Sequence, residues 1–302
     1  MAGSEKSLGI GSAHGKVILV GEHTVVHGTP AIAFPVPGLR VSASVRRHVT
    51  GQKGVQPRGV ETAVAGALRR WNRDIEGVDV ALHCGVPPGR GLGASAACAT
   101  AAVRAAADLH RVPLDARTLH ELVQEGEHVA HGRASGVDAR AVAADTPIWF
   151  AGGTARPLAV EMDASLVIAD TGVTASTCDA VRRVRTHLAA SPADRERTLG
   201  RAAVLVEAAA DDLAAGDATG LGLRMRDFHE LLAALGVSAP AVDRLVAAAL
   251  AAGAAGAKLT GGGLGGCVLA LAAPARDAAG LRAALERAGA VRTWSVPLGA
   301  AS

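Results

Sequence analysis

The sequence is poor in aromatic residues and has no concentrated block of basic charge. Only 2% of the 302 residues are aromatic, tyrosine is absent, and the formal net charge is +3. Proteins that bind nucleic acids usually combine a basic patch with aromatic side chains that stack on bases. We therefore expect no nucleic-acid partner, whereas a small anionic ligand is compatible with this composition.

Paired cysteines and long apolar runs are also absent. The four cysteines are widely spaced and form no C-x-x-C pair, so we interpret them as reduced thiols. The N-terminal residues lack the apolar segment of a secretory signal. No apolar run reaches the roughly 18–20 residues that a membrane-spanning helix needs. These features predict a cytoplasmic protein that has no membrane partner.

The remaining composition fits a packed globular protein. Apolar residues make up 49% of the chain and charged residues 20%, and the length suits one large domain or two ordinary ones. Only four of the 31 basic residues are lysines, namely Lys6, Lys16, Lys53 and Lys258. A lysine within a motif is therefore more informative in this chain than an arginine.

Periodicity predicts a β-rich start followed by alternating strands and helices, with helices dominating the second half. Strands are predicted at Val17–Val20, Ala31–Val36, Val41–Val45, Val78–Cys84, Ile148–Ala151, Leu166–Asp170, Ala257–Leu259, Cys267–Ala272 and Val291–Val296. Helices are predicted at Glu61–Arg73, Ala96–Leu109, Leu114–His131, Cys178–Leu188, Arg195–Ala215, Leu221–Leu235, Pro240–Ala251 and Ala275–Ala288, with a further helix beginning near Ser135. We place the domain boundary around residues 152–165 and assign residues 1–155 and 156–302 to the two domains.

A glycine loop, Gly89–Ser95, connects a predicted strand to a predicted helix. The free N–H groups at the start of such a helix can bind phosphate, and glycine lets the backbone approach it closely. Ser95 could bind Mg²⁺ or simply cap the helix. The segment also matches the loose dinucleotide form G-x-G-x-x-A, but no acidic residue follows a strand about 20 positions later. Phosphate binding and a capped tight turn both remain open on spacing alone.

Two carboxylates, Glu127 and Asp138, lie at the end of one predicted helix and the start of the next. Phosphoryl transfer to an alcohol needs a metal-binding carboxylate and a group that accepts the hydroxyl proton. Ser135 and Asp138 also form a fair capping box, which the pattern alone favours. His128 and His131 could ligate a metal, but no third ligand follows at a typical spacing, so surface histidines are the simpler interpretation.

A second glycine-rich loop lies between two predicted strands, in Lys258–Cys267. Such a loop lets the backbone wrap closely around a ligand or around another loop. A flexible hairpin is the alternative interpretation.

Together, three motifs in this order resemble the GHMP kinase superfamily of small-molecule kinases. They are Ala13-His-Gly-Lys16, Pro87-Pro-Gly-Arg-Gly-Leu-Gly-Ala-Ser-Ala-Ala97 and Lys258-Leu-Thr-Gly-Gly-Gly-Leu-Gly-Gly-Cys267. Within the superfamily, the segments Gly21–Gly28, Gly126–Asp138, Asp170–Thr177 and His229–Ser238 are similar to the mevalonate kinases. The chain departs from the usual pattern at His14, Ala94 and Leu264.

The resemblance implies an α+β fold of two domains, the first like ribosomal protein S5 domain 2 and the second ferredoxin-like, with the site between them. It implies ATP-dependent phosphorylation of the 5-hydroxyl of mevalonate in isoprenoid precursor biosynthesis. Asp138 would be the general base and Lys16 its charged neighbour, while Ser95 and Glu127 would hold Mg²⁺. The ATP-binding residues would be Pro88, Gly89, Arg90, Gly91, Leu92, Gly93, Ala94, Ser95 and Ala96. Mevalonate would contact Lys16, Glu22, His23, Asp138, Thr171 and Gly262.

Other interpretations stay open at this point. A nicotinamide-dependent oxidoreductase could use the loop at Gly91, and a non-catalytic relative would bind ATP without turnover. Among kinases, phosphomevalonate, the 3-position of mevalonate or a sugar are rival acceptors. Since relatives of this superfamily are often dimers, a homodimer is one expectation.

Overall fold

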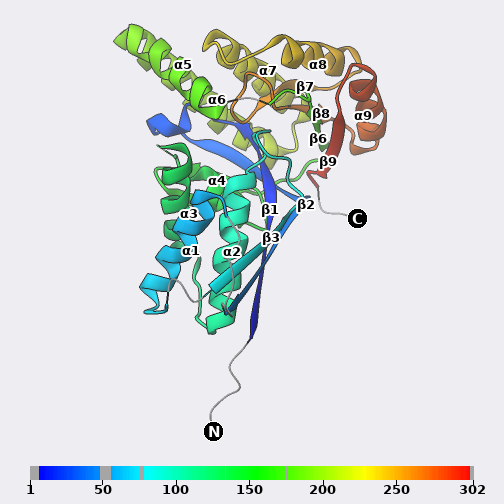
Figure 1. The fold of residues 1–302 in the computed structure, drawn as a ribbon. Helices are drawn as coiled ribbons and strands as arrows, with labels where there is room; N and C mark the ends of the chain where they lie inside the picture. Colours follow the sequence, from blue (N-terminus) through cyan, green and yellow to red (C-terminus); the bar gives the residue numbers. More distant parts are fainter. Residues whose placement is uncertain (1–6, 48–55, 75–77, 133, 175, 300–302) are drawn as a thin grey trace. The chain divides into compact units, whose positions relative to one another are not determined.

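The computed structural model describes residues 7–47, 56–74, 78–132, 134–174 and 176–299 (Figure 1). The chain groups into two compact units, each built from strands and helices. The first unit is Met1–Lys16, Pro35–Pro88 and Gly93–Ala144, and the second is Val17–Phe34, Gly89–Leu92 and Asp145–Ser302. The mixed content and the division into two units agree with the predicted two-domain α+β class.

The grouping is discontinuous because two long strands run through both units. They are β1 (Leu8–Val20) and β2 (Ala31–Arg47), which follow one another in a sheet that continues through β4 and β5, with β3 paired to β2. The contiguous domains 1–155 and 156–302 stay a prediction. The segments Val17–Phe34 and Gly89–Leu92 group instead with the later part of the chain.

The first unit packs three helices against one another: α1 (Arg58–Arg70), α2 (Ala94–His110) and α3 (Ala116–His131). The short α4 (Val137–Ala141) contacts α2 and α3, and β3 (Val78–Cys84) pairs antiparallel with the second half of β2. Nearly every side of α2 is buried, because its many alanines allow close contact on all faces. This helix forms the centre of the unit.

The structure extends the predicted strand Val17–Val20 backwards to Leu8. The added part contains Gly9 and Gly11, where a Cβ atom would lie 2.1 and 2.2 Å from backbone carbonyl oxygens of α2. Hydrophobic periodicity misses this part, because glycines that touch a helix backbone carry no apolar side chain.

The second unit contains a four-stranded antiparallel sheet in the order β7-β8-β6-β9. In chain order these strands are β6 (Ser165–Asp170), β7 (Gly256–Thr260), β8 (Cys267–Ala272) and β9 (Arg292–Pro297). Helices α5 (Thr177–Ala190), α6 (Pro192–Ala215), α7 (Ala218–Ala234) and α8 (Pro240–Ala251) precede β7, and α9 (Ala278–Arg287) joins β8 to β9. This order is that of the ferredoxin-like β-α-β-β-α-β arrangement, with additional helices in the first crossover.

A short hairpin completes the second unit. Its strands are β4 (Ile148–Ala151), which also pairs with the start of β2, and β5 (Thr154–Pro157). The sequence pattern missed β5, because this four-residue strand is largely polar and ends in proline. Short 3₁₀ turns lie at Val25–His27 and Ala275–Asp277, so the predicted helix Ala275–Ala288 is regular α-helix only from Ala278. Within the described part of the chain, no helix has the length and hydrophobicity needed to cross a bilayer.

Candidate active site

Lys16 and Asp138, both in the first unit, form an ion pair. The Lys16 Nζ lies 2.9 Å from the Asp138 Oδ1. Lys16 is 2% exposed, whereas the Asp138 side chain is 34% exposed. The lysine is thus enclosed by protein, while its partner carboxylate keeps access to a ligand.

The glycine loop reaches this pair through Gly93. A Cβ atom at Gly93 would lie 2.9 Å from Cγ and 3.1 Å from Cε of Lys16, so the absence of a side chain makes room for the lysine stem. Gly93 is also the N-cap of α2, in the left-handed conformation with φ 78°. The ion pair and the end of the loop therefore lie together at the start of this helix.

The two capping interpretations do not describe the observed helix ends. Helix α2 begins after Gly93 without a side-chain cap, and the half-buried Ser95 lies in its first turn. Helix α4 begins after Gly136, also without a side-chain cap. Ser135 accepts a hydrogen bond from the Val137 amide at 3.4 Å, while the Asp138 carboxylate is directed to Lys16. The side chains of Ser95 and Asp138 therefore remain available for roles in binding or chemistry.

Glu127 is buried at the end of α3, on the side that meets α2. Burial raises the pKa of the Cys98 thiol to about 12, with smaller contributions from Cys84 and from the Glu127 carboxylate. Since Cys98 follows Ser95 by three residues on α2, both side chains lie on one face of that helix. Ser95 and Glu127 therefore border the same packed surface.

A Mg²⁺ ion held with a nucleotide needs few protein ligands, usually one or two carboxylates in addition to phosphate and water oxygens. The hydroxyl of Ser95 and the buried carboxylate of Glu127 are hard oxygen donors that fit this requirement. Among the described residues, no group of three or more His, Cys, Asp and Glu side chains is arranged to hold a metal ion. His128 is exposed on α3, and its Nδ1 donates to the Gln124 carbonyl.

The segment of β1 before Lys16 is hydrogen-bonded to residues that follow α4. The ring nitrogens of His14 lie 2.8 Å from the Gly15 carbonyl oxygen and 2.9 Å from the Ala144 carbonyl oxygen. Arg104 donates to the carbonyls of Ser12 and Ala143. These contacts hold β1 beside the chain that follows Asp138, at a position where the sequence departs from the family pattern.

The second unit contains another lysine–carboxylate pair, in which Lys258 donates to Glu22 Oε1. The Lys258 side chain is 0% exposed and Glu22 is 2% exposed. Burial lowers the pKa of Lys258, and the Glu22 carboxylate opposes that shift. The Thr260 hydroxyl also bonds both the amide and the carbonyl of Ile18, which joins β7 to the end of β1. The Lys258–Glu22 pair is thus enclosed by protein.

His23 follows Glu22 and has a left-handed backbone with φ 64°. Its Nε2 donates to the Gly262 carbonyl at 3.1 Å. Burial lowers the pKa of His23 to about 4; this hydrogen bond opposes the shift and the Lys258 ammonium adds to it. The imidazole is therefore neutral near pH 7, and its Nδ1 is a hydrogen-bond acceptor.

The two glycine loops of the sequence meet in the second unit. A Cβ atom on Gly91 would lie 2.9 Å from the Cα of Gly261, and one on Gly261 would lie 2.6 Å from the Cα of Gly91. The Leu264 amide donates to the Val237 carbonyl at 2.7 Å, so the second loop is fixed by its own contacts. It packs against the first loop, which agrees with the interpretation of a loop that wraps closely around another loop.

Two further predicted residues are held near the end of β6. The buried Thr171 donates from its hydroxyl to the Gly266 carbonyl at 2.8 Å. Arg90 forms an ion pair with Asp170, with 3.0 Å between the Arg90 Nε and the Asp170 Oδ1. Of the other loop residues, Leu92 and Ala96 are buried, Ala94 is half-buried and Pro88 is exposed.

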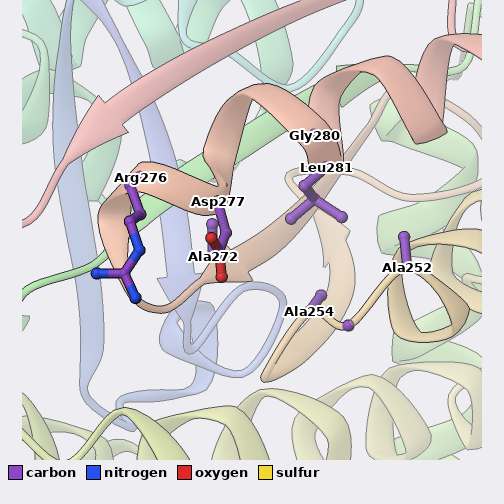
Figure 2. A pocket seen from close by; sticks show the side chains of 8 residues that line it. Ala252, Ala254, Ala272, Arg276, Asp277, Gly280 and Leu281 are labelled. Carbon is purple, nitrogen blue, oxygen red and sulfur yellow. The ribbon is translucent and has the colours of Figure 1, made fainter.

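A separate cavity of about 360 Å³ lies beside α9 in the second unit (Figure 2). Small side chains dominate its lining, and Arg276 and Asp277, which have opposite charges, are its only ionisable residues. None of the predicted site residues lines it.

All four cysteines of the chain are free thiols.

Lys258 and Asp170 were not among the predicted site residues. Lys258 could have been found, because it is one of only four lysines and it begins the third motif. Nothing local marks Asp170 as the partner of Arg90, since the two residues lie 80 positions apart.

Comparison with known proteins gives consistent matches along the chain. The model of the GHMP kinases N-terminal domain matches residues 60–145, and that of the GHMP kinases C-terminal domain matches residues 209–291. A mevalonate kinase of Aeropyrum pernix is 34% identical, covering 94% of this chain and 95% of that protein. A mevalonate kinase of Pyrococcus horikoshii is 33% identical over 87% of this chain and 88% of its own length. The crystal structure of L. major mevalonate kinase in complex with R-mevalonate superposes with a TM-score of 0.81 at 28% identity, covering 98% of both chains.

Proposed function

The chain belongs to the GHMP kinase family, and from this premise we infer that it is a mevalonate kinase. It transfers the γ-phosphoryl group of ATP to the 5-hydroxyl of mevalonate, giving 5-phosphomevalonate and ADP. The reaction belongs to the mevalonate pathway of isoprenoid precursor biosynthesis. Within the structure, the observation that best supports this chemistry is the Lys16–Asp138 pair at the glycine loop.

Asp138 is the general base in this proposal. Its carboxylate is accessible, so one oxygen can accept the proton of the 5-hydroxyl while the other stays on Lys16. The buried ammonium of Lys16 orients the carboxylate through the ion pair and offsets negative charge on the phosphoryl group during transfer. Because Lys16 is enclosed, its charge is weakly screened by water and acts strongly at this point.

The loop from Pro88 to Ala96 holds the phosphates of ATP. Its glycines adopt positive φ values, and the amides at the start of α2 supply donors for an anion. Ser95 and Glu127 would hold Mg²⁺, which neutralises phosphate charge when bound. The family commonly has two serines at positions 94 and 95, so Ala94 removes one hydroxyl from the loop while Ser95 retains the other.

The acceptor substrate is recognised by residues near the turn after β1 and near β6. His23 is neutral, so its Nδ1 suits a hydroxyl donor of mevalonate better than the carboxylate. Thr171 and Gly262 complete the proposed contacts, whereas the predicted contact at Glu22 would require the enclosed Glu22–Lys258 pair to rearrange. In the structure the Glu22 carboxylate binds Lys258. Its direct contribution is therefore to hold the turn that carries His23.

A substrate panel tests the function. Purified full-length protein with Mg-ATP is offered mevalonate, phosphomevalonate, homoserine and galactose, and ADP release and the phosphorylated position are measured. We expect turnover with mevalonate alone and phosphate on the 5-hydroxyl. Preferred turnover of another acceptor, or phosphate at the 3-position, would overturn the substrate assignment.

A thermal-shift comparison separates the remaining alternatives. Mg-ATP should raise the melting temperature and NAD should not, because only a ligand of the native state stabilises it. An ATP shift without turnover of any acceptor would favour a non-catalytic relative. A cytoplasmic location and a homodimer are parts of the proposal that fractionation and sedimentation can test.

A further inference from the structure

The side chain of Arg90 is fully engaged by protein groups. Its Nε lies 3.0 and 3.1 Å from the two carboxylate oxygens of Asp170. Its Nη1 donates to the Thr174 hydroxyl at 2.9 Å, and its Nη2 donates to the Gly172 carbonyl at 3.1 Å. All three nitrogens of the guanidinium thus have an acceptor within one short turn of chain.

That turn, Asp170–Thr174, is itself firmly held. The Asp170 Oδ1 accepts a bond from the Gly172 amide at 2.8 Å, and Thr171 bonds to the Gly266 carbonyl through both its amide and its hydroxyl. The Asp170 side chain is only 6% exposed. Arg90 therefore binds a turn whose first two residues, Asp170 and Thr171, are buried and held by hydrogen bonds, while Gly172–Thr174 are exposed.

The loop that carries Arg90 needs such an anchor. Gly89, Gly91 and Gly93 have φ values of 66°, 75° and 78°, and glycine loses more conformational freedom than other residues when it is fixed. The two residues between them, Arg90 and Leu92, supply the only long side chains in this stretch. Leu92 is buried, and Arg90 is fixed by the ion pair and hydrogen bonds described above.

We propose that Arg90 is a positioning residue for the nucleotide: its guanidinium fixes the entrance of the glycine loop to the Asp170–Thr174 turn, so that the loop amides are held ready for phosphate. This inference rests on the proposed function, because it assumes that the loop binds ATP. In this proposal the backbone of Arg90 is part of the phosphate-binding loop. Its side chain binds the Asp170–Thr174 turn and does not bind phosphate. Preorganised amide donors bind an anion better than amides that must be ordered on binding.

The first test is Arg90→Met in the full-length protein, with initial rates measured against Mg-ATP at saturating mevalonate. We expect the KM for ATP to rise about tenfold, the usual scale for losing hydrogen bonds to a charged group, while kcat falls by less than about threefold. Arg90→Lys should give an intermediate KM, because an ammonium keeps the charge but cannot reach all three acceptors. An unchanged KM in Arg90→Met overturns the proposal.

A double-mutant cycle separates positioning from direct phosphate binding. If Arg90 acts through Asp170, then Asp170→Asn alone raises the KM for ATP, and the Arg90→Met/Asp170→Asn variant is no worse than Arg90→Met. If Arg90 instead binds phosphate directly, Asp170→Asn leaves the KM near the wild-type value. That second outcome contradicts the proposal.

Effects on stability and effects on nucleotide binding need separate control variants. Arg90→Met leaves a buried carboxylate without its main partner and can lower the melting temperature, whereas the double variant removes both charges and keeps the test usable. Arg182→Met is the matched control, since Arg182 pairs with Asp179 on the exposed surface of α5. It should leave both kinetic constants unchanged.

Direct binding of a non-hydrolysable Mg-ATP analogue, measured by calorimetry, distinguishes this inference from the proposed function. If the wild-type protein binds the analogue but does not phosphorylate mevalonate, the substrate assignment fails and the Kd comparison still tests Arg90. If the wild-type protein phosphorylates mevalonate and Arg90→Met has the wild-type Kd, the function stands and the positioning role is wrong.

Discussion

The two lysine–carboxylate pairs of this protein use the same chemical groups in opposite surroundings. Lys16 is buried, but its partner Asp138 is 34% exposed. Lys258 and its partner Glu22 are 0% and 2% exposed. The first pair therefore has one side open to a ligand, whereas the second is closed on every side.

This difference in exposure assigns the pairs different tasks. A buried charge that faces an accessible carboxylate can act on a reacting group, because little water screens it. A fully enclosed pair cannot touch a substrate without rearrangement, and breaking it leaves an uncompensated charge inside the protein. We therefore expect the open pair to control the rate of reaction and the closed pair to control stability.

The sharpest test of the open pair is Asp138→Asn. We expect kcat to fall by about 10²- to 10⁴-fold, the usual scale for losing a general base, while the protein still folds and binds ATP. Steady-state kinetics and a thermal-shift assay measure both. Asp179→Asn, in an exposed pair with Arg182, is the matched control and should keep full activity. Near-normal turnover in Asp138→Asn would remove Asp138 from the mechanism.

The closed pair should respond in stability. Lys258→Met removes the ammonium that binds the enclosed Glu22 carboxylate, and we expect a loss of about 3–5 kcal/mol in the free energy of unfolding. Chemical denaturation monitored by circular dichroism measures it. The double variant Glu22→Gln/Lys258→Met removes both charges and should recover much of the loss.

The control for the closed pair is Arg201→Met, which breaks an exposed pair with Glu230 and should cost at most about 1 kcal/mol. If Lys258→Met were as stable as Arg201→Met, the closed pair would have no special structural role. The claim that the closed pair controls stability would then be wrong.

The smallest expected effect is a pH dependence beside the closed pair. The pKa of His23 is about 4 in the folded protein, below the 6.5 of an ordinary histidine, because burial disfavours its charged form. The unfolded chain therefore binds this proton first as the pH falls. Its stabilising contribution is fully present above about pH 6.5 and is lost as the pH falls towards 4, up to about 3 kcal/mol.

His23→Asn tests this dependence, since asparagine tolerates the left-handed backbone of this position. The melting temperature of the variant should fall less steeply between pH 6.5 and pH 4 than that of the wild type. His187→Gln, an exposed histidine on α5 in the same unit, should keep the wild-type slope. Parallel curves for His23→Asn and the wild type would contradict the buried neutral imidazole.

Much of the fold was predictable from local pattern. Helices such as α3 and α8 and strands such as β3 and β8 occur within a few residues of their predicted bounds, because their periodicity and capping residues are local properties. The part of β1 before Val17 and the strand β5 were missed. Glycines at a helix contact, and a short polar edge strand, carry little local signal.

The candidate site was predictable in residue type more than in arrangement. The scarcity of lysine directed attention to Lys16, and the spacing of Glu127 and Asp138 indicated two carboxylates near one cleft. The same pattern left a cap at Ser95 open and favoured a cap at Ser135, and the observed helix ends use neither. The role of the Arg90 side chain could not be read locally, because its acceptors lie in a distant turn.

By itself, the sequence determined the α+β class, the two glycine loops, and the few positions at which a lysine or carboxylate could take part in chemistry. Only the tertiary structure decided which carboxylate each lysine meets and how far water reaches it. Glu22 and Lys258 are 236 positions apart, so no local periodicity relates them. Burial sets the electrostatic strength and the accessibility of a charged pair, and burial is a property of the packed chain as a whole.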